Sequence, residues 1–213
     1  WSARYKHLID WKGVDEISQE IIDFVPGKKW VTDSGQDVHF IITGGEPMLW
    51  QRETQHLLRQ PAFKDLKNLT IETNCTQHFK SGFDKFLHGL VNGDYTKHPV
   101  HVTWSTSPKL SISGEEWNKA IIPDVAKQYA DIPNSKLYFK FVVQDDKDLE
   151  EVDKAKNEYA KAGVDADIYL MPVGATFEGQ EKTSRQVADI CLQYGYKFSP
   201  RLHVDLFGNK WGT

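Results

Sequence analysis

The chain has 213 residues, of which 39% are hydrophobic, and its net charge is −4 with histidine neutral. Chains of this length and composition usually bury one core, so we expect a single domain, residues 1–213. The weak negative charge argues against a nucleic-acid partner. No apolar run approaches the roughly 18 residues of a membrane span, so we expect no membrane contact and a cytoplasmic protein.

Short apolar runs alternate along the chain with stretches of helical spacing. The runs predict six strands, at 38–43, 69–73, 100–104, 137–143, 166–171 and 196–202. Helices are predicted before and between them, at 14–24, 49–58, 82–91, 114–129, 146–162 and 181–192. This alternation is typical of βα units, and it predicts an α/β fold with a partial barrel of about six mostly parallel strands. A doubly wound sheet is the alternative that the sequence leaves open.

Polar residues follow most of the predicted strands. In both architectures, ligands bind at the carboxyl ends of the strands, so the residues that follow each strand are the candidates for a site. Along the chain these are Thr43-Gly44-Gly45-Glu46-Pro47, Glu72-Thr73-Asn74, Ser105-Thr106-Ser107-Pro108-Lys109, Lys140 and Gln144, Met171-Pro172-Val173-Gly174, and Arg201 with His203.

The first of these clusters combines a bare backbone with a negative charge. Gly44 and Gly45 carry no side chains, so a ligand could approach the main chain there, and Glu46 could pair with an ammonium group of that ligand. Pro47 can occupy the first position of a following helix. An ordinary turn is the alternative interpretation, and spacing alone does not separate the two.

Each remaining cluster also has a structural interpretation. Glu72-Thr73-Asn74 is explicable as a turn or capping cluster, and Lys109 as a solvated surface residue. His203 lies in an apolar–polar alternation, where a structural histidine is more common than a ligand or a catalyst. The recurrence of such clusters after several strands is what favours a site.

The chain has two cysteines, Cys75 and Cys191, and it begins with Trp1 rather than with methionine. Two cysteines are too few for a disulfide scaffold or for a cysteine-ligated zinc or iron–sulfur site. We therefore interpret both as small apolar residues.

Together these motifs resemble the radical S-adenosylmethionine superfamily and, within it, the 7-carboxy-7-deazaguanine synthase family. The similarity extends over most of the chain from residue 38 onward. Gly-Gly-Glu-Pro by itself indicates only the superfamily, and the combination with the later motifs points to this family. The matching stretches are Ile41-Ile42-Thr43-Gly44-Gly45-Glu46-Pro47, Ile71-Glu72-Thr73-Asn74, Thr103-Trp104-Ser105-Thr106-Ser107-Pro108-Lys109-Leu110, Met171-Pro172 and Arg201-Leu202-His203-Val204-Asp205.

The resemblance implies a reduced (β/α) barrel that holds S-adenosylmethionine at the carboxyl ends of its strands. Gly44, Gly45 and Glu46 would receive the methionyl amine of the cofactor. The other residues expected to contact the cofactor are Thr73, Asn74, Ser107 and Lys109. Those expected to contact the substrate are Glu72, Gln144, Arg201 and His203, and no catalytic residue is assigned.

The family's chemistry, as the resemblance implies it, is that of a lyase in queuosine-type deazapurine biosynthesis. A [4Fe-4S] cluster cleaves S-adenosylmethionine reductively, and the resulting radical abstracts hydrogen from 6-carboxy-5,6,7,8-tetrahydropterin. Ring contraction with loss of ammonia, assisted by Mg²⁺, then gives 7-carboxy-7-deazaguanine. The cofactors supply the difficult chemistry, and the protein orients and shields the reactants. The expected partners are the pterin substrate, a second copy in a homodimer, and an electron donor such as flavodoxin.

The sequence departs from the family pattern at its cluster ligands. The family holds its cluster with a CxxxCxxC run, followed by an aspartate and a threonine that is associated with magnesium, and none of these occurs here. The chain as given therefore carries no metal ligands. We expect the cysteine run and the magnesium threonine upstream of Trp1, and we expect the chain without them to be inactive.

Two other functions remain open at this point. Another small radical S-adenosylmethionine enzyme, such as a glycyl-radical activase, would keep Gly44 to Pro47 but has no reason to keep the Ser107-Pro108-Lys109 and His203 motifs. A non-catalytic module that binds S-adenosylmethionine or a purine-like ligand is the alternative outside the enzymes. A soluble α/β domain without radical chemistry is the least specific interpretation.

Overall fold

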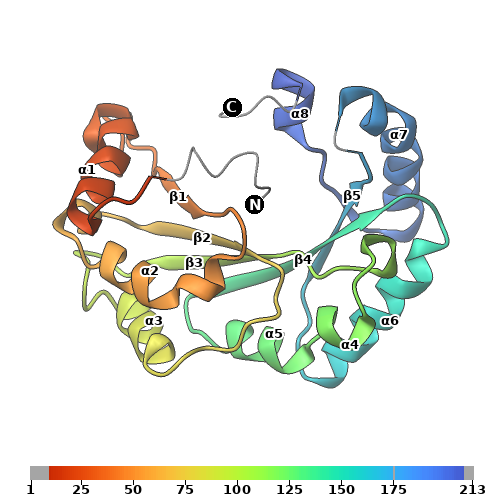
Figure 1. The fold of residues 1–213 in the computed structure, drawn as a ribbon, viewed down its shortest axis with the longest axis horizontal. Coiled ribbons are helices and arrows are strands. Elements are labelled where there is room, and N and C mark those ends of the chain that lie inside the picture. Colours follow the sequence, from red (N-terminus) through yellow and green to blue (C-terminus); the bar gives the residue numbers. More distant parts are fainter. Residues whose placement is uncertain (1–9, 175, 209–213) are drawn as a thin grey trace. The chain divides into compact units, whose positions relative to one another are not determined.

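The computed structural model describes residues 10–174 and 176–208 (Figure 1). Their six strands form one open sheet in the order β1-β2-β3-β4-β5-β6, so β1 and β6 are its edge strands. The strands are β1 (His39–Ile42), β2 (Asn68–Thr73), β3 (His101–Thr106), β4 (Ser135–Val143), β5 (Asp167–Pro172) and β6 (Lys197–Phe198). The α-helices are α1 (Val14–Phe24), α2 (Gln51–Leu58), α3 (Phe83–Asn92), α4 (Trp117–Ala120), α5 (Pro123–Ala130), α6 (Asp148–Lys161), α7 (Phe177–Tyr194) and α8 (Leu202–Phe207).

The prediction of an α/β fold with about six mostly parallel strands is confirmed, and the open sheet agrees with a partial barrel rather than a closed one. None of the helices in the described part of the chain has the length and apolar character that crossing a membrane requires.

Contacts divide the chain into two compact units. Unit 1 comprises the described residues up to Glu72 together with 77–104 and 131–136, and unit 2 comprises 73–76, 105–130 and the described residues from Leu137 onward. The chain therefore passes from one unit to the other inside β2, β3 and β4, and also after Thr76 and after Ala130, which lie outside the strands. The expectation of a single domain stays a prediction.

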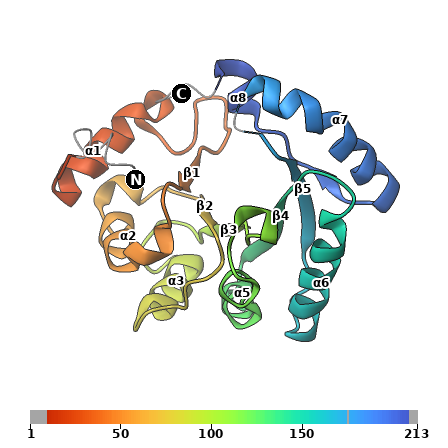
Figure 2. The same ribbon diagram turned by 45° about the vertical axis from the view of Figure 1, so that its right-hand side comes forward.

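Unit 1 has a parallel strand pair with helices on one side (Figure 2). Helix α2 contacts both α1 and α3. Along β2, Leu69 and Ile71 are buried and alternate with partly exposed residues, so Glu72 points to the opposite face of the strand from Ile71. The alternation thereby directs an acidic side chain away from the core.

Unit 2 repeats this design. Strands β4, β5 and β6 pair in parallel, α7 packs on β5 and β6, and α5 packs on α6. On β4, alternate residues are buried, and Phe139 stacks on Tyr159 of α6 with 4.1 Å between ring centroids. The opposite face of β4 carries Tyr138, Lys140 and Val142, which are partly exposed. On β5, the residues in register with these are Asp167, Tyr169 and Met171, and we call the whole surface the uncovered face of β4 and β5.

One predicted helix is broken in the structure. The predicted helix at 114–129 is divided into α4 and α5, and a short 3-10 turn (η5, Ser111–Ser113) precedes them. Pro123 begins α5, and the backbone at Ile121 is extended. Proline at the first helical position disfavours the helical conformation in the residue before it, which explains the break.

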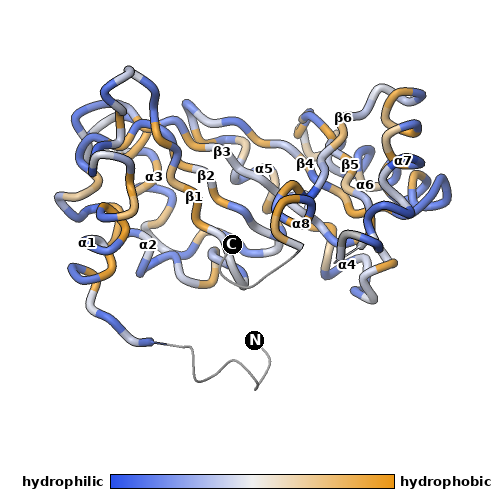
Figure 3. The backbone as a smooth tube through the Cα atoms, turned by 90° about the horizontal axis from the view of Figure 1, so that it is seen from above, coloured by the Kyte–Doolittle hydropathy of each residue, from blue (hydrophilic) through white to orange (hydrophobic). Residues whose placement is uncertain are grey.

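The predicted strand at 196–202 is wrong over most of its length. Only Lys197 and Phe198 pair with β5, and residues from Leu202 onward form α8 instead. Pro200 lacks the N–H that a strand ladder needs, and Leu202 and Leu206 are spaced by four residues along one helix face. Figure 3 shows α8 as a mainly hydrophobic segment. His203, expected on a strand, therefore lies on a helix.

Candidate functional site

The loop after β1 presents the bare backbone that its two glycines predict. Gly44 and Gly45 have φ values of +88° and +55°, which disfavour other residues, and both are exposed. No heavy atom lies within 4 Å of a Cβ added to Gly44. A ligand can therefore approach this main chain from the solvent side.

Glu46 ends this loop and begins the next helical turn. Its side chain caps a 3-10 helix (η3, Pro47–Trp50) by accepting a hydrogen bond from Met48 N to its Oε1, at 3.0 Å. Pro47 occupies the first position of that turn, as predicted, and it is buried. The capping role agrees with the turn interpretation, and the pairing of Glu46 with a ligand stays a prediction.

Glu72 lies at the carboxyl end of β2 and is joined to the loop after β1. The hydroxyl of Thr43 donates a hydrogen bond to Glu72 Oε2 at 2.9 Å. Within unit 1, this bond brings Glu72 next to the residue that precedes Gly44. Sequence reasoning identified Glu72 but not Thr43 as its partner, because nothing in the sequence pairs residues that are 29 positions apart.

In unit 2, the segment after β2 turns sharply. Asn74 Oδ1 accepts hydrogen bonds from both the amide and the hydroxyl of Thr76, at 3.1 and 2.7 Å, and Thr73 Oγ1 accepts from Cys75 N at 3.1 Å. Cys75 is buried with φ +63°, an uncommon conformation for a residue other than glycine. The turn interpretation of this cluster is therefore correct, and contact with a cofactor is untested.

The segment after β3 is hydrogen-bonded to that turn. Ser107 N donates to Thr73 O at 2.7 Å, so the structure brings these two predicted residues together. Pro108 is buried and Lys109 is exposed. Ser105, near the end of β3, is buried, and its hydroxyl has no hydrogen-bond partner among the described residues.

The remaining substrate candidates of unit 2 differ in their surroundings. Arg201 is partly buried at the carboxyl end of β5: its Nε donates to the sulfur of Met171, and its Nη1 donates to the carbonyl oxygen of Gly174, both at 3.2 Å. The side chains of Gln144 and His203 are exposed. The structure therefore holds Arg201 in one position and leaves the other two at the surface.

The uncovered face of β4 and β5 carries residues that the sequence-based site did not include. The rings of Tyr138 and Tyr169 lie 4.9 Å apart, and Lys140 pairs in register with Tyr169. Lys197 of β6 lies over Tyr169 and forms an ion pair with Asp167 at 2.6 Å. The period-two alternation within residues 135–143 could have identified this polar and aromatic face.

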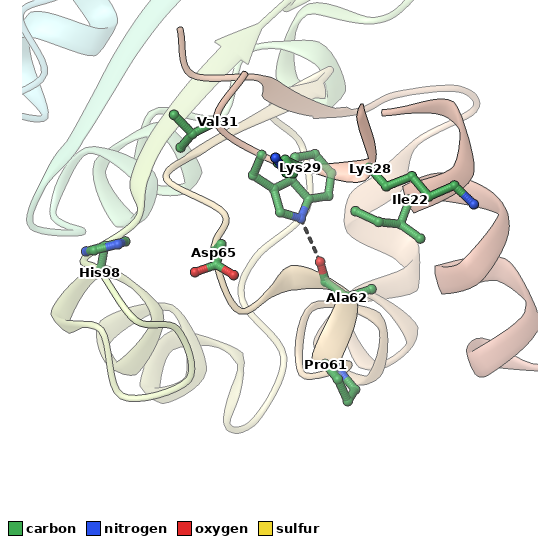
Figure 4. Close-up of a pocket in the computed structure, with 9 residues that line it drawn as sticks. Ile22, Lys28, Lys29, Val31, Pro61, Ala62, Asp65 and His98 are labelled. Atoms are coloured by element: carbon green, nitrogen blue, oxygen red, sulfur yellow. Dashed lines mark hydrogen bonds between the residues drawn. The ribbon is translucent and has the colours of Figure 1, made fainter. Parts of the chain in front are cut away.

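A pocket of about 410 Å³ lies at the other end of the strands of unit 1 (Figure 4). Its walls come from segments that precede β1, β2 and β3, namely Ile22, Lys28, Lys29, Trp30, Val31, Pro61, Ala62, Asp65 and His98. Trp30 is held by a hydrogen bond of 2.6 Å from its Nε1 to the carbonyl oxygen of Ala62. Lys28, Lys29 and Asp65 each form an ion pair, which compensates their charges. None of the residues that line this pocket is a predicted site residue.

The described residues do not provide a metal centre. They contain no group of three or more His, Cys, Asp or Glu that could hold a metal ion. Both cysteines are buried, and burial raises the pKa of the Cys191 thiol above its ordinary value, which opposes formation of the thiolate that metals bind. The described residues therefore do not fit an iron–sulfur cluster.

Comparison with known proteins identifies relatives of the chain. It is 29% identical over 175 residues to a 7-carboxy-7-deazaguanine synthase of Pyrobaculum aerophilum and 31% identical over 175 residues to a 7-carboxy-7-deazaguanine synthase of Halobacterium salinarum. The chain is a relative of the 7-carboxy-7-deazaguanine synthases. These matches cover 82% and 80% of the chain but only 67% and 65% of the relatives, so the chain spans about two thirds of their length. No protein-family model matches the chain.

The fold also has a neighbour among solved structures. The crystal structure of Streptococcus suis SuiB, bound to the precursor peptide SuiA, matches with a TM-score of 0.52 and 16% identity. The match covers 91% of this chain and 43% of SuiB. At this identity the likeness supports the α/β fold alone.

Proposed function

We propose that this relative of the 7-carboxy-7-deazaguanine synthases is a radical S-adenosylmethionine enzyme of deazapurine biosynthesis. Its substrate is 6-carboxy-5,6,7,8-tetrahydropterin and its product is 7-carboxy-7-deazaguanine, which makes it a lyase. The observation that carries the proposal is the similarity over 175 residues to two synthases of that name. The motifs of the chain that resemble the family support the same assignment.

The loop after β1 fits the amino-acid end of S-adenosylmethionine. Its two exposed glycines leave main-chain groups accessible, and Glu46 adds a carboxylate that suits an ammonium group. We assign the methionyl amine to Gly44, Gly45 and Glu46. When bound, S-adenosylmethionine supplies the reactive adenosyl group, and the protein's contribution is to hold and orient it. Cofactor contacts of Thr73, Asn74, Ser107 and Lys109 stay predictions.

We assign no residue of this chain to the cluster or to magnesium. Two buried cysteines cannot supply three thiolates, and the described residues hold no other group of metal ligands. The roles of Glu72, Gln144 and His203 toward the substrate stay predictions, as do the homodimer, the electron donor and the cytoplasmic location.

The test is an assay of the full-length protein after anaerobic iron–sulfur reconstitution. The protein is incubated with S-adenosylmethionine, a reductant and the carboxylated tetrahydropterin, and the products are measured by mass spectrometry. We expect 7-carboxy-7-deazaguanine and ammonia. Cleavage of S-adenosylmethionine without conversion of the pterin would keep the superfamily and reject this substrate.

A non-catalytic binding module is the second candidate, and it is favoured by the described residues, which hold no group of metal ligands and in which both cysteines are buried. Equilibrium binding of S-adenosylmethionine separates the two candidates when it is combined with the assay. A protein that binds the cofactor but assembles no cluster on reconstitution would be such a module.

A further inference from the structure

In the described part of the chain, the guanidinium of Arg201 has only neutral hydrogen-bond partners. It donates to a thioether sulfur and to a carbonyl oxygen, both of which are neutral acceptors. Among residues 10–174 and 176–208, no Asp or Glu forms an ion pair with it. A partly buried guanidinium with five donors is best satisfied by a carboxylate, so this arrangement favours an anionic ligand.

The position of Arg201 places this charge beside the uncovered face. Met171 is in register with Val142 of β4 and lies two residues after Tyr169, on the same side of β5. Because Arg201 Nε contacts the Met171 sulfur, the guanidinium lies over the carboxyl end of this face. An aromatic surface with a cation at its rim suits a planar ring that carries a carboxylate.

The backbone beneath Arg201 is held by residues at the start of α7. Gln180 is 2% exposed, and its Oε1 accepts a hydrogen bond from Arg201 N at 3.4 Å. Gly174, whose carbonyl oxygen holds the guanidinium, packs so closely on this turn that an added Cβ would lie 2.6 Å from Gln180 N. The hydroxyl of Thr183 donates to Val173 O at 2.7 Å and fixes the same segment.

Packing alone gives no reason for an amide at position 180. Gln180 Nε2 is buried and has no hydrogen-bond partner among the described residues, which is unfavourable. An apolar side chain of similar size would avoid this unsatisfied donor. What the amide adds is the acceptor that fixes the main chain at Arg201.

We infer that Arg201 receives the carboxylate of the substrate and that Gln180 is a positioning residue, which holds Arg201 for that contact. The inference rests on the proposed function, because it names the part of the pterin that the site in unit 2 recognises. Gln180 acts through Arg201 and need not touch the substrate itself.

The test compares two ligands that differ only in the carboxylate. Binding of 6-carboxy-5,6,7,8-tetrahydropterin and of 5,6,7,8-tetrahydropterin to the full-length protein is measured by anaerobic calorimetry, with S-adenosylmethionine and without reductant. A charge-assisted hydrogen bond predicts a preference of about tenfold or more for the carboxylated ligand. Arg201→Met should abolish the preference, and Arg201→Lys should keep part of it because lysine retains the charge but not the planar fork.

Gln180→Leu should reduce the preference several-fold without changing the affinity for tetrahydropterin. The matched control is Gln186→Leu, the same change at an exposed position of α7, which should alter neither affinity. Gln180→Met serves as a second variant if the leucine variant does not fold, and thermal melting monitors both.

Three outcomes would overturn the inference in different ways. Equal affinity of the wild type for the two ligands would reject the carboxylate contact but leave the proposed pterin substrate intact. Failure of both pterins to bind would reject the proposed function as well. If Gln180→Leu lowered both affinities by the same factor, Gln180 would have a general structural role and not a positioning one.

Discussion

Two glycines that follow strands, Gly44 after β1 and Gly174 after β5, have positive φ values for different reasons. A Cβ at Gly44 would meet no heavy atom within 4 Å, whereas a Cβ at Gly174 would lie 2.6 Å from backbone atoms of both Gly179 and Gln180. Gly44 therefore leaves main chain open to a ligand, and Gly174 allows two segments of protein to pack closely. Glycine thus leaves a loop accessible in unit 1, whereas in unit 2 it allows a loop to be fixed by close packing.

The largest expected effect comes from replacing Gly174 by alanine, with the same change at Gly44 as the comparison. Gly174→Ala should lower the free energy of unfolding by about 3 kcal/mol, because the clash involves backbone atoms and φ is +139°. Gly44→Ala should cost only about 1 kcal/mol, since at φ +88° it meets strain but no clash. Urea denaturation of both variants provides the measurement. Equal losses would show that the difference in packing has no energetic consequence.

The accessible loop should depend on charge for binding rather than for stability. We expect Glu46→Gln to weaken S-adenosylmethionine binding about tenfold, because a charged partner of the amine is lost. The fold should persist, since the amide oxygen can still accept the hydrogen bond from Met48 N. Glu53→Gln, at an exposed position of α2, is the control. Calorimetric titration that found unchanged affinity for Glu46→Gln would remove Glu46 from the proposed cofactor site.

The side-chain link between the ends of β1 and β2 should make a smaller contribution. Thr43→Val removes the hydroxyl that donates to Glu72 Oε2 and should cost about 1 kcal/mol of stability. Thr43→Ser retains the hydroxyl and should recover most of that loss. Urea denaturation measures both variants, and a valine variant as stable as the wild type would mean that this bond contributes nothing.

The loop after β1 and the surroundings of Arg201 were not equally predictable from the sequence. Gly44, Gly45 and Glu46 are adjacent in the sequence. A stretch of main chain without side chains requires glycine, which is a local property, so the loop after β1 could be identified directly. The bonds among Thr73, Asn74 and Thr76 are local too, and the turn interpretation of that cluster was correct.

The surroundings of Arg201 could not be found in the same way. The predicted helix at 181–192 begins one residue after Gln180, whereas α7 begins at Phe177. Gly179 weakens the local helical signal, and the contact of that turn with Gly174 forms only in the folded chain. Arg201 and Gln180 are 21 residues apart and belong to segments whose conformations were partly wrong in the prediction, so their contact had no signal in the sequence.

The smallest expected effect concerns a buried hydroxyl in unit 2. Tyr159 is fully buried and stacks on Phe139, yet its hydroxyl has no hydrogen-bond partner among the described residues. Tyr159→Phe should therefore leave stability unchanged or raise it by up to about 1 kcal/mol, because no bond is lost and an unsatisfied group is removed. Burial, with a smaller contribution from Cys75, raises the pKa of Tyr159 above its ordinary value.

The sign of that pKa shift fixes the pH at which Tyr159→Phe is tested. A raised pKa in the folded state favours the neutral phenol, so the associated stability is fully present below about pH 10, the ordinary pKa of tyrosine, and declines above it. Urea denaturation at pH 7 therefore reports the packing of the neutral ring alone. A clear loss of stability there would reveal a partner for the hydroxyl. Weaker ligand binding at unchanged stability would instead show that the buried Tyr159 hydroxyl supports the site in unit 2.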